Sequence, residues 1–145
     1  MTEKTRVSCI ECGATNNYPA FAGDKKVVCG KCRKELPRPG MVLEGTPAQL
    51  DLLMQKSKLP LLVDFYSPAC APCQIMHPIL EKLAGRRAGE LTVLRMNTDQ
   101  HSSFSGQLGI HAVPTFLVLA NGNERGRMNG AMPEADFSFW VASLV

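Results

Sequence analysis

The stretch "LPLLVDFYSPACAPC", residues 59–73, holds the most information about the fold. Its first eight residues are almost all apolar, and Asp64 is the one charged side chain among them. A run of this kind predicts a strand that is buried on both faces of a sheet. A short turn follows, and a helix should begin near Cys70, one turn ahead of Cys73. The stretch therefore predicts an α/β protein in which a C-x-x-C pair lies between a buried strand and a helix.

The segments around this stretch predict further helices and strands. Thr46, Pro47 and Gln49 form a capping box with proline at the first helical position, so a helix should span 46–56. The helix that starts near Cys70 should be kinked by Pro78. The remaining predictions are a strand over 91–97, a short polar helix over 100–109, a hairpin over 115–128 around Asn121 and Gly122, and a helix over 133–145. This order predicts a mixed central sheet flanked by helices.

The composition is typical of a soluble globular protein, since 45% of the 145 residues are hydrophobic and 20% are charged. No apolar run approaches the roughly 20 residues of a membrane helix. The stretch "MTEKTRVSC" lacks the hydrophobic core of a signal peptide. We therefore expect a cytoplasmic protein with no membrane partner. We also expect a monomer. A reducing compartment disfavours structural disulfides and favours metal-binding or catalytic cysteines.

Residues 1–36 contain few large apolar residues and four of the six cysteines. The four are Cys9, Cys12, Cys29 and Cys32. Sixteen residues separate the two C-x-x-C pairs, a spacing typical of a four-thiolate zinc site. Gly13 and Gly30 should supply the backbone freedom that the two turns need. Four protein ligands leave no position for substrate, so we expect one structural zinc ion in a zinc ribbon. The alternative is four free or disulfide-bonded thiols.

The stretch "RKELPRPG", residues 33–40, contains two prolines and a glycine and indicates a linker. We place the domain boundary near Pro39, with a zinc-ribbon-like domain at 1–39 and a second domain at 40–145. Residues 1–40 carry eight Lys/Arg against four Asp/Glu, while the rest of the chain is nearly neutral. This basic head could contact an acidic partner or RNA. A solvated lysine-rich surface is the simpler explanation, and we expect no nucleic-acid partner.

Cys70 and Cys73 have a different setting from the other four cysteines. Cys70 should lie at a helix N-terminus, where unpaired N–H groups and the helix dipole favour an anion. Its pKa should therefore fall below that of a free cysteine. Cys73 lies on the helix face that should be buried, so Cys70 is the exposed attacking thiol and Cys73 the sheltered resolving thiol. The alternative, half of a second metal site, lacks a partner pair in this chain.

Asp64 and two histidines are the remaining candidates. A carboxylate in a buried strand loses hydration, which raises its pKa, so Asp64 could accept the proton of Cys73. It could instead lie at a solvated strand end. His77 could lower a thiolate pKa but is more simply a surface residue, and His111 could border a substrate groove. A papain-like hydrolase is not supported, because its local cysteine signature is absent.

Several motifs together resemble one protein family. The stretch "VDFYSPACAPCQIMHP" is similar to the active-site segment of thioredoxins, and "GIHAVPTFLVLANG" is similar to the later loop that contains their proline. The stretch "MNGAMP" resembles the glycine segment of their last strand. With its four-cysteine head, the chain resembles the zinc-binding thioredoxins of the bacterial thioredoxin-2 group. The resemblance implies a thioredoxin-like fold over 40–145, preceded by a small zinc ribbon.

The resemblance also implies roles for individual residues. Cys70 would form a mixed disulfide with a substrate, and Cys73 would resolve it. Pro114 matches a proline whose preceding peptide bond is cis in the family. Val113 would offer its backbone to an extended substrate strand, and Gly130 would line the same groove.

The chain departs from the family pattern close to the cysteine pair. Asp64 matches the buried aspartate of the family, but four nearby positions differ. They are Tyr66 and Ala69 in place of tryptophans, Ala71 in place of glycine and Gln74 in place of a basic residue. These differences leave the reduction potential and the choice of partners open.

We expect a thiol–disulfide oxidoreductase that reduces protein disulfides and maintains the cytoplasmic redox state. The resemblance implies disulfide-containing protein substrates and an NADPH-dependent thioredoxin reductase that regenerates the dithiol. The chain contains no G-x-G-x-x-G fingerprint, so we expect no organic cofactor on it. Two rivals remain. One is a zinc-ribbon module that binds protein or RNA on a passive scaffold, and the other is a redox sensor or chaperone whose zinc thiolates oxidise.

Overall fold

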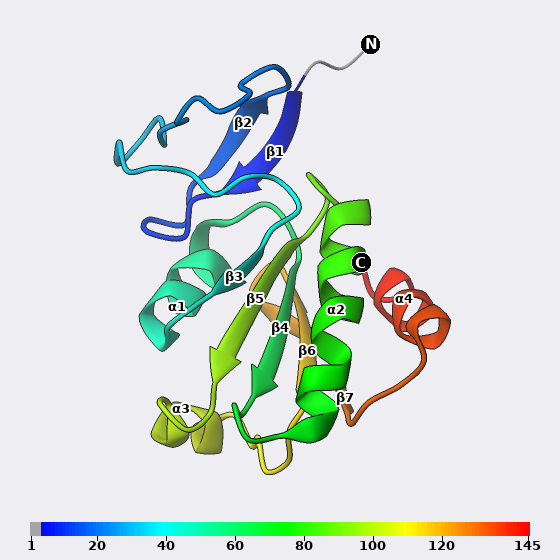
Figure 1. Ribbon diagram of the computed structural model, residues 1–145. Helices are drawn as coiled ribbons and strands as arrows, with labels where there is room; N and C mark the ends of the chain where they lie inside the picture. Colours follow the sequence, from blue (N-terminus) through cyan, green and yellow to red (C-terminus); the bar gives the residue numbers. More distant parts are fainter. Residues whose placement is uncertain (1–3) are drawn as a thin grey trace.

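The computed structural model describes residues 4–145, which form two separate sheets and four helices (Figure 1). The strands are β1 (Lys4–Ser8), β2 (Thr15–Pro19), β3 (Val42–Glu44), β4 (Leu61–Tyr66), β5 (Thr92–Asn97), β6 (Thr115–Ala120) and β7 (Asn123–Asn129). The helices are α1 (Pro47–Lys56), α2 (Ala71–Arg86), α3 (Ser102–Gln107) and α4 (Glu134–Ala142). The first three residues of the predicted zinc ribbon lie outside the described residues. Across 4–145, no helix has both the length and the apolarity needed to cross a membrane.

The larger sheet has the strand order β3-β5-β4-β6-β7. Strands β3, β5 and β4 run parallel, whereas β6 and β7 are antiparallel to their neighbours. The central strand β4 is buried on both faces, which explains its nearly continuous apolar sequence. The predicted mixed sheet flanked by helices is therefore confirmed. Strand β3 has no clear signal in the sequence, because three residues are too few to show an alternating pattern.

Helices cover both faces of this sheet (Figure 1). Helices α2 and α4 pack against one face, where Leu62 and Phe137 are fully buried. Helices α1 and α3 cover the opposite face, where Leu50 and Phe65 are buried. Successive side chains of a strand alternate between the two faces. Asp64, two residues after Leu62, therefore lies on the face that α2 covers.

Helices α1 and α2 begin where the sequence predicts. The Gln49 N–H donates to Thr46 Oγ1 at 3.2 Å, and the Thr46 N–H donates to Gln49 Oε1 at 3.0 Å, which completes the capping box. Cys70 is the N-cap of α2. The helix then continues through Pro78 to Arg86 without interruption.

The hairpin of β6 and β7 turns at Asn121 and Gly122. Ala120 pairs with Asn123, and the two residues between them have positive φ angles of 53° and 77°. Positive φ at both positions is the mark of a type I′ turn, which favours Asn-Gly. The predicted hairpin is confirmed, and β7 becomes an edge strand that leads into Gly130.

The head contains the β1–β2 sheet and two cysteine turns of similar geometry. The Gly13 N–H donates to the Cys9 carbonyl at 2.8 Å, and the Arg33 N–H donates to the Cys29 carbonyl at 3.0 Å. Gly13 and Arg33 both have positive φ, at 83° and 69°. The prediction that Gly30 supplies the freedom of the second turn is wrong, because the left-handed residue there is Arg33. Each left-handed residue directly follows the second cysteine of its pair.

Part of the stretch predicted as a linker belongs to the head. Leu36 is buried in the small core of the head, and its N–H donates to the Val27 carbonyl at 2.7 Å. Glu35 forms an isolated antiparallel bridge with Val28. The segment that connects the head to β3 is therefore limited to residues 37–41.

The head packs against the body beside the C-terminal half of α1. Gly13 approaches so closely that a Cβ there would lie 2.5 Å from the Leu52 carbonyl oxygen. Two hydrogen bonds also join the parts, Ser8 Oγ with Ser57 Oγ at 2.6 Å and the Lys58 N–H to Thr15 Oγ1 at 2.9 Å. These contacts place the head at the end of the body that is opposite the N-terminus of α2 (Figure 1).

Candidate functional site

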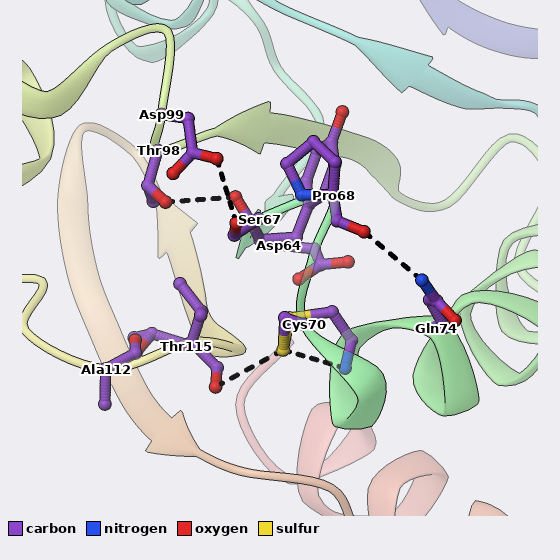
Figure 2. Close-up of a disulfide and its surroundings, with 12 residues drawn as sticks. Asp64, Ser67, Pro68, Cys70, Gln74, Thr98, Asp99, Ala112 and Thr115 are labelled. Carbon is purple, nitrogen blue, oxygen red and sulfur yellow. Dashed lines mark hydrogen bonds between the residues drawn. A yellow bond between two sulfur atoms is a disulfide. The ribbon is translucent and has the colours of Figure 1, made fainter.

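Cys70 and Cys73 form a disulfide at the N-terminus of α2 (Figure 2). Their Cα atoms are 5.2 Å apart. The Cys73 N–H donates to Cys70 Sγ at 3.1 Å. The unpaired N–H groups and the positive end of the dipole of α2 lie at the same position. This setting favours negative charge on the sulfur of Cys70.

The two cysteines differ in their access to solvent. Cys70 is partly exposed, whereas Cys73 is 1% exposed. Ala69 and Ala71 are exposed on either side of Cys70. The Gln74 side chain donates to the Pro68 carbonyl at 3.2 Å and ties the turn to the helix (Figure 2). An approaching disulfide can therefore reach Cys70 but not Cys73.

Asp64 is fully buried in the middle of β4, and not at a solvated strand end. In Figure 2 its side chain points toward the disulfide. Burial raises the pKa of Asp64 to about 6, although Arg95 acts to lower it. Arg95 Nε donates to Asp64 Oδ2 at 3.2 Å, and Oδ1 has no hydrogen-bond partner among the described residues. A carboxyl with a raised pKa and one free oxygen is suited to accept a proton.

The backbone at Val113 and Pro114 faces the disulfide. Their peptide bond is cis, and the Val113 carbonyl oxygen lies 3.7 Å from Cys70 Sγ. Pro114 is buried, and its carbonyl accepts the Gly130 N–H at 2.8 Å. Gly130 has a φ of 88°, and a Cβ at this position would meet nothing within 4 Å. The fold therefore gathers Val113, Pro114 and Gly130 on one side of Cys70.

Two pockets flank the disulfide. One has a volume of about 300 Å³, and its lining includes Val113, His111 and Asp99. The other has a volume of about 220 Å³, and its lining includes Cys73 and His77. Both histidines therefore border the site, but neither forms a hydrogen bond to a sulfur within residues 4–145.

The four cysteines of the head converge on one point, where they could hold a metal ion. Their sulfurs all lie within 4.8 Å of one another. The sulfurs of Cys9 and Cys32 are 3.6 Å apart, and those of Cys12 and Cys29 are 3.7 Å apart. A regular tetrahedron with Zn–S bonds of ~2.3 Å places its sulfurs about 3.8 Å apart. The donor set and its spacing therefore fit a zinc ion.

Cys29 accepts several hydrogen bonds at this cluster. The Lys31 N–H and Asn16 Nδ2 donate to its sulfur at 3.4 and 3.5 Å. Burial opposes ionisation of Cys29, but these bonds and one from the Cys32 backbone lower its pKa to about 6. Ligands of protein-bound metals are commonly held by hydrogen bonds of this kind.

The head, which holds the cysteine cluster, and the N-terminus of α2, which holds the disulfide, lie at opposite ends of the body (Figure 1). The head contacts Ser57 and Lys58, which precede β4, whereas Cys70 follows the other end of this strand. The cluster therefore forms no part of the surroundings of the disulfide.

Comparison with known proteins settles the family of the body. Residues 41–143 match the family model named Thioredoxin. The chain belongs to the thioredoxin family. It is 31% identical over 100 residues to a thioredoxin of Haemophilus influenzae, which covers 69% of this chain and 94% of that protein. It is 38% identical over 95 residues to a chloroplastic M-type thioredoxin of Pisum sativum, which covers 66% of this chain and 55% of that protein.

A solved thioredoxin structure also matches the fold. It is that of a mutant thioredoxin from Halobacterium salinarum NRC-1, with a TM-score of 0.66 and 25% sequence identity. The match covers 74% of this chain and 94% of the other. Membership of the thioredoxin family makes the chain a disulfide oxidoreductase, and the Cys70–Cys73 pair fits its redox site. The family match begins at residue 41, after the cysteine cluster.

Arg95 is a site residue that sequence reasoning missed. It is the one charged residue in the apolar stretch "LTVLRMN", and it pairs in register with Asp64. A lone arginine in one buried strand and a lone aspartate in another are together a signal for an ion pair, since buried charges are usually paired. The signal becomes specific only when the two strands are known to be neighbours.

Proposed function

We propose that this thioredoxin-family protein reduces protein disulfides, with Cys70 as the nucleophile and Cys73 as the resolving thiol. The observation that carries the proposal is the disulfide at the start of α2, in which Cys70 is partly exposed and Cys73 is buried. The hydrogen bond from the Cys73 N–H and the helix dipole would stabilise the Cys70 thiolate in the reduced protein.

The reaction has two exchange steps. The Cys70 thiolate attacks one sulfur of a substrate disulfide, a mixed disulfide forms, and the other substrate sulfur leaves as a thiolate. Cys73 then attacks the Cys70 sulfur, which releases the second substrate sulfur and leaves the Cys70–Cys73 disulfide. Two electrons pass from the protein to the substrate. The disulfide at the start of α2 is the state of the protein after this reaction.

Asp64 is the proposed proton acceptor in the second step. Cys73 must lose its proton before it can attack, and it is too buried to release that proton directly to bulk water. The Asp64 carboxylate faces the disulfide, and its Oδ1 is free to take the proton (Figure 2).

Val113 and Gly130 are proposed to border the groove for the substrate. A substrate strand could pair with the backbone of Val113, whose carbonyl already faces Cys70. The missing side chain at Gly130 leaves room beside Pro114 for that strand.

We further propose that Cys9, Cys12, Cys29 and Cys32 bind one structural zinc ion, as in the thioredoxin-2 group. The convergence of the four sulfurs within 4.8 Å of one another supports this proposal, and zinc would supply a fixed cross-link for a head with a very small core. Zinc analysis of the purified protein should give one equivalent, which is lost in Cys12→Ser. Protein prepared with zinc present that carries none, with disulfides among these cysteines, would contradict the proposal.

The proposed setting is a reducing compartment, the cytoplasm, with disulfide-containing proteins as substrates and an NADPH-dependent thioredoxin reductase as the electron source. This setting is supported by the three C-x-x-C pairs, because cysteines of this pattern are metal-binding or catalytic in reducing compartments.

Reduction of insulin disulfides, followed by turbidity, tests the proposed reaction. Wild type should be active, and Cys70→Ser and Cys73→Ser should both lose nearly all turnover. Ala142→Ser, which places a hydroxyl at an exposed position of α4, is the control and should match wild type. Equal activity of Cys70→Ser and wild type would favour the rival in which the body is only a scaffold for the head.

A further inference from the structure

A row of polar side chains crosses three parallel strands beneath α2. Glu44 of β3 is the register partner of Arg95 in β5, and Arg95 is the register partner of Asp64 in β4. Register partners in a sheet project from the same face. Tyr66 lies two residues after Asp64 on β4 and therefore shares this face. The row extends from an exposed carboxylate at the sheet edge to a buried carboxyl that points toward the disulfide (Figure 2).

The four side chains contact one another in sequence. Arg95 Nε donates to Asp64 Oδ2 at 3.2 Å. The guanidinium carbon of Arg95 lies 3.7 Å from the centroid of the Tyr66 ring. The Tyr66 hydroxyl donates to Glu44 Oε2 at 2.7 Å. Glu44 therefore holds Tyr66, Tyr66 supports Arg95, and Arg95 binds Asp64.

Arg95 needs this support to stay on Asp64. An arginine side chain loses much rotamer freedom when it is held in one position, and a single hydrogen bond to Asp64 offsets only part of that cost. A guanidinium stacked on an aromatic ring gains a further cation–π attraction, which is stronger when the cation is desolvated. The Arg95 side chain is 15% exposed, so the stacking contributes to its position.

We propose that Glu44 and Tyr66 are positioning residues for proton transfer at Asp64, in which Tyr66 holds Arg95 on the carboxylate and Glu44 anchors Tyr66 and opposes the charge of Arg95. The inference rests on the proposed function, in which Asp64 takes the proton of Cys73. Arg95 occupies Oδ2, so the proton passes from the Cys73 sulfur to Oδ1, and the sulfur keeps the electron pair with which it attacks Cys70.

The two positioning residues should shift the pKa of Asp64 in opposite directions. Burial is the largest cause of the raised pKa, the charge and hydrogen bond of Arg95 lower it, and the charge of Glu44 raises it. The other titratable groups around this row are Tyr66 on β4 and Cys73 and His77 of α2, which line the same pocket as Arg95. The neighbour of Asp64 on β6 is the apolar Phe116.

Two substitutions test the two predicted directions of the pKa change at Asp64. Glu44→Gln keeps an acceptor for the Tyr66 hydroxyl but removes the negative charge, so the pKa of Asp64 should fall. Tyr66→Leu removes the ring that holds Arg95, so the pKa should rise. We expect a shift of about half a pH unit in each direction. Glu90→Gln is the matched control, because it removes an exposed carboxylate beyond the other end of β5.

The pKa of Asp64 is measured by NMR in the oxidised protein, from the ¹³C chemical shift of its labelled carboxyl carbon as a function of pH. This readout does not depend on activity. The proposal is supported if the pKa of Asp64 falls in Glu44→Gln, rises in Tyr66→Leu and stays unchanged in Glu90→Gln. An unchanged pKa in Glu44→Gln, or shifts of the same sign in both variants, overturns it. Glu44 is exposed, so its variant decides the question even where Tyr66→Leu does not fold.

A second measurement separates this inference from the proposed function. The rate at which Cys73 releases a peptide from the mixed disulfide is followed against pH in a single turnover. The pH midpoint of this step should move in the same two directions as the carboxyl pKa. A midpoint that stays constant while the pKa moves would overturn the role of Asp64 as proton acceptor, and the inference with it. If wild type does not reduce the peptide disulfide at all, the proposed function itself is refuted.

Discussion

At the scale of single residues, the site depends on one buried carboxyl. Asp64 is fully buried, and burial raises its pKa from 3.8 to about 6 against the opposing effect of Arg95. Between these two pH values the folded protein holds a proton that the unfolded chain has released, so stability falls as the pH rises. The ionised carboxylate therefore destabilises the folded protein above about pH 6 and has no such effect below about pH 4.

We predict that Asp64→Asn stabilises the oxidised protein by about 3 kcal/mol at pH 7, because each pH unit between the two pKa values corresponds to ~1.4 kcal/mol. At pH 4 the difference should nearly vanish. Urea unfolding at both pH values measures the effect, with Asp51→Asn, an exposed carboxylate on α1, as the control. A stabilisation of equal size at pH 4 and pH 7 would show that it does not arise from ionisation.

At the scale of helices and strands, local chemistry explains where the elements of the body begin and turn. The capping box at Thr46 starts α1, and Cys70 starts α2 by accepting the N–H of Cys73. The Asn121-Gly122 turn sets the register of β6 and β7. The same helix start that positions Cys70 also provides its electrostatic setting.

We predict that Thr46→Ala lowers the free energy of unfolding by about 1 kcal/mol, because the Gln49 N–H loses its acceptor at the start of α1. Urea unfolding at pH 7 measures the loss. Thr46→Ser retains a hydroxyl and should lose much less. An equal loss in both variants would assign the effect to the threonine methyl group and not to the cap.

Elements with such local signals could be predicted from the sequence, and those that depend on distant pairing could not. The helix at Thr46, the buried strand around Asp64 and the turn at Asn121 all have short-range causes. Strand β3 exists because it pairs with β5, and its three residues show no pattern of their own. Arg33 adopts a left-handed conformation because the second cysteine turn requires it, although glycine would be favoured there.

Some residues of the candidate site could likewise be predicted from the sequence, and others could not. The cysteines and Asp64 have signals in spacing and composition. In the structure Cys70 and Cys73 form a disulfide, and the Asp64 side chain points toward it. Arg95 and Glu44 come from strands that lie far apart in the sequence, and only the strand order brings them into one row. Their contribution therefore depends on the fold and not on any local motif.

At the scale of the whole molecule, the head and the body form separate cores that meet in a small set of contacts. Two glycines lie at close approaches between the parts, Gly13 against the Leu52 carbonyl of α1 and Gly89 against the Thr5 side chain of β1. The first cysteine turn is thus packed directly against the body. Conditions that unfold the head should therefore also loosen the C-terminal half of α1.

We predict that Gly13→Ala weakens this packing. A side chain at a φ of 83° costs about 1 kcal/mol, and its Cβ would also meet the Leu52 carbonyl oxygen at 2.5 Å. Gly23→Ala is the matched control, because its φ is 59° and nothing lies within 4 Å. Hydrogen exchange should be faster in Gly13→Ala in β1, β2 and the end of α1, and near wild type in Gly23→Ala. Similar exchange in the two variants would contradict the close approach.

The attack of Cys70 on a disulfide is tested most directly by trapping the mixed disulfide. Reduced Cys73→Ser and Cys70→Ser are each mixed with a disulfide-containing peptide, and adducts are located by peptide mapping and mass spectrometry. We predict that Cys73→Ser accumulates an adduct at Cys70, whereas Cys70→Ser forms none at Cys73. An adduct at Cys73 that forms as quickly, or the absence of an adduct at Cys70, would contradict the assignment of the nucleophile.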